Sequence, residues 1–231
     1  MKNNNQPQSA IGRILFTPTL FKDITKKDGE IAFALVALFE IISLCIVGLT
    51  KREVYLPIAI VFFLLLVVMN KSKLHTLGLT TKKWKMTACI FVVLFVIAFF
   101  VNWENIQNGK IAGYDFVINS VYYLGLMFFT EQIIFVGYLW SRMVTLFGNH
   151  KGTIVCGILY GMTHLLFAYC LGGATISILS VINFICEGVL MQYCFSFLYA
   201  YSGNIYLPTI IHAAYHFFVV EKTLSYFMEM F

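Results

Sequence analysis

Long apolar stretches, separated by short polar loops, occupy most of this chain from Ile31 onward. Several of them approach the roughly 20 residues that an α-helix needs to cross the hydrocarbon core of a bilayer. Charged residues make up only 12% of the chain, against about 25% in soluble domains. A membrane β-barrel would instead alternate apolar and polar residues along each strand. The sequence therefore predicts an all-α protein, a polytopic bundle of transmembrane helices.

We expect about eight transmembrane helices, preceded by a polar cytoplasmic segment at 1–30 and followed by a tail at 221–231. The helices are predicted at about 31–49, 55–69, 86–102, 115–140, 153–169, 172–186, 187–201 and 204–220. Tight connections are indicated by Gly172-Gly173 and by Ser202-Gly203-Asn204. Residues 71–85 form a polar loop, and the sequence shows no internal repeat.

The basic residues predict the orientation of these helices. With eight spans and a cytoplasmic N-terminus, 13 of the 16 Lys and Arg residues lie in cytoplasmic segments, and only Lys51, Arg52 and Lys110 do not. This bias follows the positive-inside rule and places both termini in the cytoplasm. The net charge is +5. The basic residues lie on either side of the predicted spans and do not form the single basic patch of a nucleic-acid-binding protein. We therefore expect a multi-pass plasma-membrane protein without a nucleic-acid partner.

Four ionisable residues lie inside the apolar runs: Glu131, His164, His212 and His216. Each costs roughly 2.5–3.5 kcal/mol at the centre of a membrane helix, so such residues are functional candidates. His212 and His216 are spaced i, i+4 and share one helix face. Tyr160 shares a face with His164 one turn later. We predict that the four residues meet in one layer nearer the cytoplasmic side, where Glu131 can act as a general base on water.

The same four side chains are also an adequate ligand set for zinc, with space for a water molecule if only three of them bind. The residues leave two alternatives open, a zinc site and a site without a metal. Two further carboxylates, Glu40 and Glu187, also lie in apolar runs. We interpret both as structural, with Asn183 one turn before Glu187 as a local polar partner.

The order of these elements resembles the CPBP family of intramembrane proteases, also called the Abi or CAAX-protease-like family. That family carries E-E-x-x-x-R, then F-x-x-x-H, then H-x-x-x-N or H-x-x-x-D, each on a different membrane helix. The matching stretches here are EQIIFV at 131–136, YGMTH at 160–164 and HAAYH at 212–216. The turn at 202–212 and the loop at 77–84 also resemble the family. The similarity covers about 77–220 as the protease core, and residues 31–76 supply additional transmembrane helices.

Three positions depart from the family pattern. Gln132 replaces the second glutamate, Val136 replaces the arginine, and His216 replaces the final asparagine or aspartate. Arg142 lies further along the chain and cannot fill the helical position of the missing arginine.

The resemblance implies an intramembrane endopeptidase that acts on a peptide or small protein at the membrane. Glu131 would take a proton from water, and His164 would position that water. His212 and His216 would polarise the scissile carbonyl, with Gln132 and Tyr160 in supporting positions.

Family analogy suggests maturation of a bacterial bacteriocin or signalling peptide, or self-immunity to one. The alternatives are a catalytically silent scaffold that binds a peptide or a partner membrane protein, and a proton-coupled transporter. A transporter would be expected to show inverted repeats.

Overall fold

The computed structural model describes residues 23–50, 54–101, 126–172 and 176–219, together with Phe21, Trp103, Gln107 and Asn108, but not the side chains of residues 172 and 216–219. Within these ranges the chain is helical and contains no strand, which confirms the all-α prediction. The elements are α2 (Lys26–Thr50), α3 (Tyr55–Met69), the 3-10 turn η1 (Leu74–Leu77), α4 (Trp84–Val101), α7 (Phe129–Gln132), the π-helix η3 (Ile133–Trp140), α8 (Ser141–Phe147), α9 (Asn149–Gly172), α10 (Ile178–Ser202) and α11 (Tyr206–Val219).

Four of the described helices, α2, α4, α9 and α10, are long and apolar enough to cross a membrane, and α3 is a shorter apolar helix. The chain is therefore a multi-pass membrane protein. Helix α10 runs unbroken from Ile178 to Ser202, so the two spans predicted at 172–186 and 187–201 are wrong. Glu187 and Gly188 interrupt the hydropathy there without interrupting the helix, because Gly188 serves as a packing contact and not as a turn.

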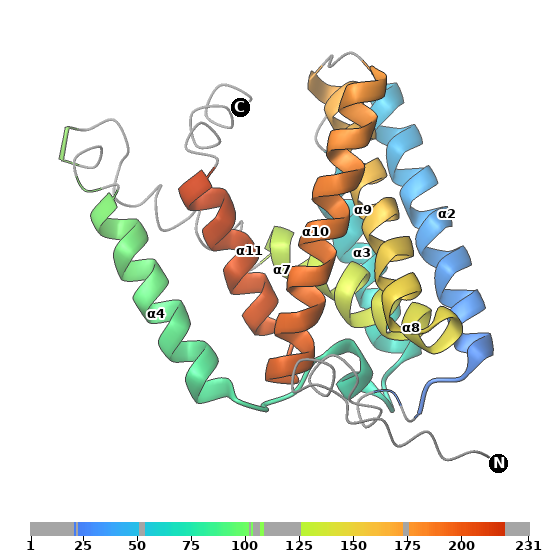
Figure 1. Ribbon diagram of the computed structural model, residues 1–231, viewed down its shortest axis with the longest axis horizontal. Coiled ribbons are helices and arrows are strands. Elements are labelled where there is room, and N and C mark those ends of the chain that lie inside the picture. Colours follow the sequence, from blue (N-terminus) through green and yellow to red (C-terminus); the bar gives the residue numbers. More distant parts are fainter. Residues whose placement is uncertain are drawn as a thin grey trace.

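The helices alternate in direction, and α2 begins at the same end of the bundle as α11 (Figure 1). Helix α11 consequently ends at the opposite end, an arrangement that does not agree with the prediction of both chain ends on one side. The termini themselves lie outside the described residues. All lysines in the described part of the chain are exposed, and they lie near the first of these two ends, in the loops or at helix starts: Lys26, Lys27, Lys71, Lys73, Lys82, Lys83, Lys85 and Lys151.

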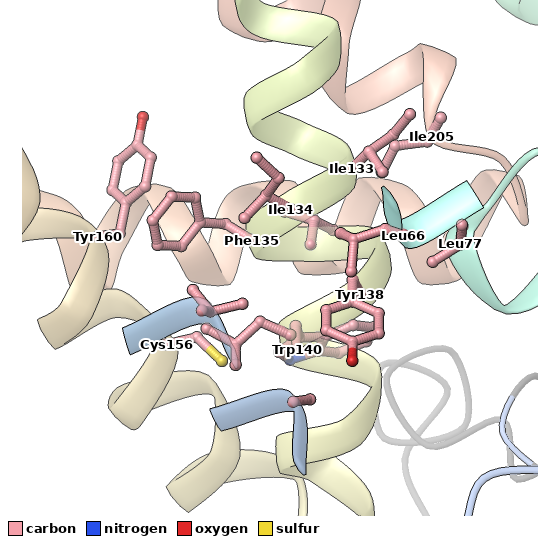
Figure 2. Packing of buried hydrophobic residues seen from close by; sticks show 14 of the residues in the cluster. Leu66, Leu77, Ile133, Ile134, Phe135, Tyr138, Trp140, Cys156, Tyr160 and Ile205 are labelled. Atoms are coloured by element: carbon pink, nitrogen blue, oxygen red, sulfur yellow. The ribbon is translucent and has the colours of Figure 1, made fainter. Parts of the chain in front are cut away.

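The segment formed by α7, η3 and α8 is the central helix of the bundle, and every residue from Glu131 to Met143 is buried. Side chains from η3 point outward in several directions, toward Leu66, Leu77, Cys156 and Tyr160 of the surrounding elements (Figure 2). Lipid tails are as apolar as these side chains, so close packing and not exclusion from water stabilises such a helix. The carboxylate of Glu131 is thereby held at the centre of the bundle.

Glycines permit the closest helix contact, between α9 and α10. A Cβ atom on Gly188 would lie 2.5 Å from the carbonyl oxygen of Gly157 and 2.6 Å from the backbone nitrogen of Gly161. Small residues of this kind let two membrane helices approach backbone to backbone. The contact fixes the position of Tyr160, which precedes Gly161, along the axis of α9 relative to α10.

We expect Gly188→Ala to destabilise the bundle by about 1–3 kcal/mol, because the added methyl group must push two backbones apart. The measurement is the thermal unfolding midpoint of the purified protein in detergent. Gly48→Ala is the control, since a Cβ atom there meets only Cys170 Sγ at 3.7 Å. Equal midpoints for the two variants would contradict the packing role of Gly188.

A network of hydrogen bonds fixes the start of α11. Gly203 ends α10 with a left-handed φ of 70°, which glycine adopts without strain. The amide oxygen of Asn204 accepts from the backbone nitrogen of Leu207 at 3.1 Å, and its amide nitrogen donates to the carbonyl of Lys82 at 2.6 Å. The hydroxyl of Thr80 donates to the carbonyl of Gly203 at 2.6 Å. The loop before α4 therefore positions the helix that carries His212.

Candidate active site

Three of the four predicted site residues meet inside the bundle, each from a different helix. Oε1 of Glu131, on α7, lies 3.4 Å from Nε2 of His164 on α9, and its Oε2 lies 3.9 Å from Nδ1 of His212 on α11. His216 follows His212 by one turn in the backbone of α11, but its side chain lies outside the described residues. The catalytic roles predicted for these residues stay predictions at this point.

Both ring nitrogens of His212 have partners. The amide nitrogen of Gln132 donates to Nδ1 at 2.9 Å, and Nε2 lies 3.3 Å from the hydroxyl oxygen of Tyr160. Because an amide nitrogen can only donate, Nδ1 is the acceptor and the ring hydrogen is on Nε2. The rings of Phe128 and Phe195 contact the imidazole at centroid distances of 4.3 and 4.7 Å. The ring of His212 is thus fixed in orientation, with Nε2–H as its donor.

His164 has the opposite arrangement. Its Nδ1 lies 3.0 Å from the backbone carbonyl oxygen of Tyr160, and since a carbonyl can only accept, Nδ1 carries the hydrogen. Nε2 of His164 faces Oε1 of Glu131, and in the neutral ring this nitrogen can accept from a water molecule that also donates to Glu131. The side chain of His164 is 38% exposed, whereas that of Glu131 is 6% exposed. The pair is therefore open on the side of His164.

The hydroxyl of Tyr160 connects the two histidines to the carboxylate. It accepts from Nε2 of His212 at 3.3 Å and lies near the carboxylate of Glu131, and its ring lies against that of His164 at 4.3 Å. Gln132 and Tyr160 were expected to support the site, and the structure places both in contact with His212.

The π-helix η3 begins directly after Gln132. Such wide turns are frequent at functional sites.

Neither the residue at the position of the family's arginine nor Arg142 supplies a cation to the site. Val136 is buried in the apolar core, and the guanidinium of Arg142 donates to Asn70 Oδ1 at 2.7 Å and to the carbonyl of Tyr138 at 3.1 Å. Arg142 therefore anchors the loop that follows α3.

Sequence reasoning missed the relation of Glu40 to this site. Glu40 is buried on α2, accepts from the hydroxyl of Tyr55 at 3.3 Å, and lies close enough to Glu131 for their charges to interact. Its position in an apolar run was the only signal in the sequence. The contact with Tyr55 arises from the packing of α2 against α3, which no local pattern encodes.

The described side chains do not fit a zinc ion. No group of three His, Cys, Asp or Glu side chains within the described residues has a suitable arrangement. Glu131 and His164 supply two donors, but both nitrogens of His212 are used by Gln132 and Tyr160. Zinc binding would require His212 to leave these partners, so it stays a prediction.

Residues 113–218 match the family model described as type II CAAX prenyl endopeptidase Rce1-like. This segment includes Glu131, His164, His212 and the helices that carry them. No curated protein and no solved structure shows significant similarity to the chain. The family match agrees with the order of the motifs, and residues 113–218 of this membrane protein are similar to the Rce1-like type II CAAX prenyl endopeptidases.

Proposed function

We propose that this protein is an intramembrane endopeptidase that hydrolyses a peptide bond by glutamate and histidine activation of water. One observation carries the proposal. The buried carboxylate of Glu131 lies 3.4 Å from Nε2 of His164, beside an Nε2–H donor that His212 presents in a fixed orientation.

In the proposed reaction, water donates to Glu131 and to His164 while its oxygen attacks the scissile carbonyl carbon. Glu131 accepts the proton as the carbon–oxygen bond forms. The negative charge that develops on the carbonyl oxygen is stabilised by Nε2–H of His212 and by the hydroxyl of Tyr160, once the carbonyl oxygen displaces the hydrogen bond that these two groups make with each other. The carbon–nitrogen bond then breaks, and Glu131 returns the proton to the leaving amine.

We further propose that the lysine-bearing end of the bundle faces the cytoplasm, as the positive-inside rule favours. At 1.5 Å per residue, His164 lies about 22 Å along α9 from Asn149 and about 12 Å from Gly172. By the same measure His212 lies about 9 Å along α11 from Tyr206, so the site lies between the two ends of the bundle. A substrate that crosses or enters the bilayer fits this depth better than a soluble cytoplasmic peptide.

As substrate we propose a secreted or membrane-associated peptide, in the maturation of a bacteriocin or signalling peptide or in self-immunity. The test compares the membrane and secreted peptides of cells that lack this protein with those of cells complemented with the wild type. Peptides that are cut only in the complemented cells would support the proposal and identify the substrate. Identical peptide patterns, with the protein present in the membrane, would favour a silent scaffold.

A further inference from the structure

An exposed carboxylate lies partway along membrane helix α10. Glu187 is exposed, and its Oε1 accepts a hydrogen bond from the hydroxyl of Tyr215 on α11 at 3.2 Å. Ionisable residues in membrane spans are costly and face a water-filled cavity or a partner. Its predicted local partner, Asn183, is not the residue that the structure pairs with it. The bond to Tyr215 instead links two helices that both carry parts of the site.

Glu187 lies at the level of the candidate active site. It precedes Gly188, whose backbone packs against Gly161 of α9, and Gly161 follows Tyr160. On α11, Tyr215 comes three residues after His212. The carboxylate is also near enough to Tyr160 for an electrostatic interaction. Glu187 is therefore at the edge of the site, on the helices that flank the half-exposed His164.

No lysine or arginine of the described part of the chain pairs with this carboxylate. The described lysines lie near the end of the bundle at which α10 terminates. The described arginine, Arg142, donates to Asn70 and to Tyr138. A negative charge beside an active site, on an exposed side chain with a hydroxyl donor on one oxygen, is suited to bind a cationic group.

We propose that Glu187, positioned by Tyr215, forms a subsite for an ammonium or guanidinium group of the peptide substrate. The inference rests on the proposed function, because it assumes that a peptide occupies the site. The cation can be a lysine or arginine side chain near the scissile bond, or the free amino terminus of the peptide. In either case the subsite selects a substrate and sets its register relative to Glu131.

The test measures binding separately from cleavage. The full chain carrying Glu131→Gln is placed in lipid nanodiscs, and fluorescent apolar peptides of about 20 residues, long enough to span the bilayer, are titrated by anisotropy. The peptides carry Lys, Gln or Glu at one position that is moved along the sequence. Each is prepared with a free and with an acetylated amino terminus, which distinguishes a side-chain cation from a terminal one.

We expect a cationic peptide to bind at least about tenfold more tightly than its neutral counterpart, as for a charge-assisted hydrogen bond. Adding Glu187→Gln should remove this preference, and Glu187→Lys should reverse it in favour of the peptide with Glu. The reversal is the decisive readout, because a merely structural role for Glu187 would not produce it. Tyr215→Phe should weaken the preference severalfold while the protein stays folded.

The matched control is Glu30→Lys, which changes an exposed glutamate near the start of α2 and should leave the preference unchanged. Equal binding of cationic and neutral peptides, or a preference that survives Glu187→Lys, would overturn the subsite. The same peptides are then incubated with the chain that retains Glu131. Selective binding without cleavage would refute the proposed protease and leave the subsite standing, so the two failures are distinguishable.

Discussion

Glu131→Gln is expected to reduce the rate of peptide cleavage by about 10²–10⁴-fold, the usual contribution of a general base. Glutamine keeps the size of the side chain, but it cannot take a proton from water. The loss should fall on kcat, since the substituted atom acts on the attacking water and not on the bound peptide.

The measurement is single-turnover cleavage of a peptide identified in the cellular comparison, using purified protein in nanodiscs. Glu30→Gln is the matched control, because it changes an exposed glutamate far along α2 from Glu40. Peptide binding and the thermal unfolding midpoint should be unchanged in Glu131→Gln. A variant that is folded and cleaves at the wild-type rate would eliminate Glu131 as the general base.

Much of the candidate site could be predicted from the sequence. Ionisable residues in membrane helices converge on one another because lipid offers them no partner, which is why Glu131, His164 and His212 were expected to meet. The i−4 spacing of Tyr160 and His164 placed both on one face of α9. Their meeting is observed in the structure, whereas their roles in catalysis remain to be tested.

Other features depend on contacts that a single sequence does not encode. Glu187 and Gly188 look like a break between two spans, but the glycine is used for backbone contact with α9 and α10 continues through it. The aromatic rings of Phe128 and Phe195 that hold His212 are indistinguishable from lipid-facing phenylalanines in the sequence. Periodicity identifies helices, and only packing decides which of their faces meet.

Gln132 stands where the family has its second glutamate, and it keeps a hydrogen bond to His212 but reverses the direction of that bond. A glutamate carboxylate would accept from Nδ1–H of His212 and leave Nε2 as a lone pair or a charged donor. The amide nitrogen of Gln132 donates to Nδ1 instead, which leaves a neutral ring with hydrogen on Nε2. His212 in this chain is therefore suited to donate to an oxyanion while it remains neutral.

This assignment makes His212→Ala the second variant with a large expected effect. Removal of one oxyanion donor typically lowers the rate by about 10²–10³-fold, and alanine would also leave the buried amide of Gln132 without its partner. His212→Asn should recover part of the activity, because its side-chain amide nitrogen can donate toward the same oxygen. Single-turnover rates of the three proteins, at matched unfolding midpoints, measure the difference.

The same set of variants separates an oxyanion donor from a zinc ligand. A donor role predicts that Asn is better than Ala, that Tyr160→Phe causes a further loss, and that a chelator leaves the wild-type rate unchanged. A ligand role predicts that Ala and Asn are equally inactive and that both lose bound metal, measured by elemental analysis of the purified protein. Equal inactivity with loss of zinc would show that His212 leaves Gln132 and Tyr160 to bind the metal, and the proposed direction of its hydrogen bonds would then be wrong.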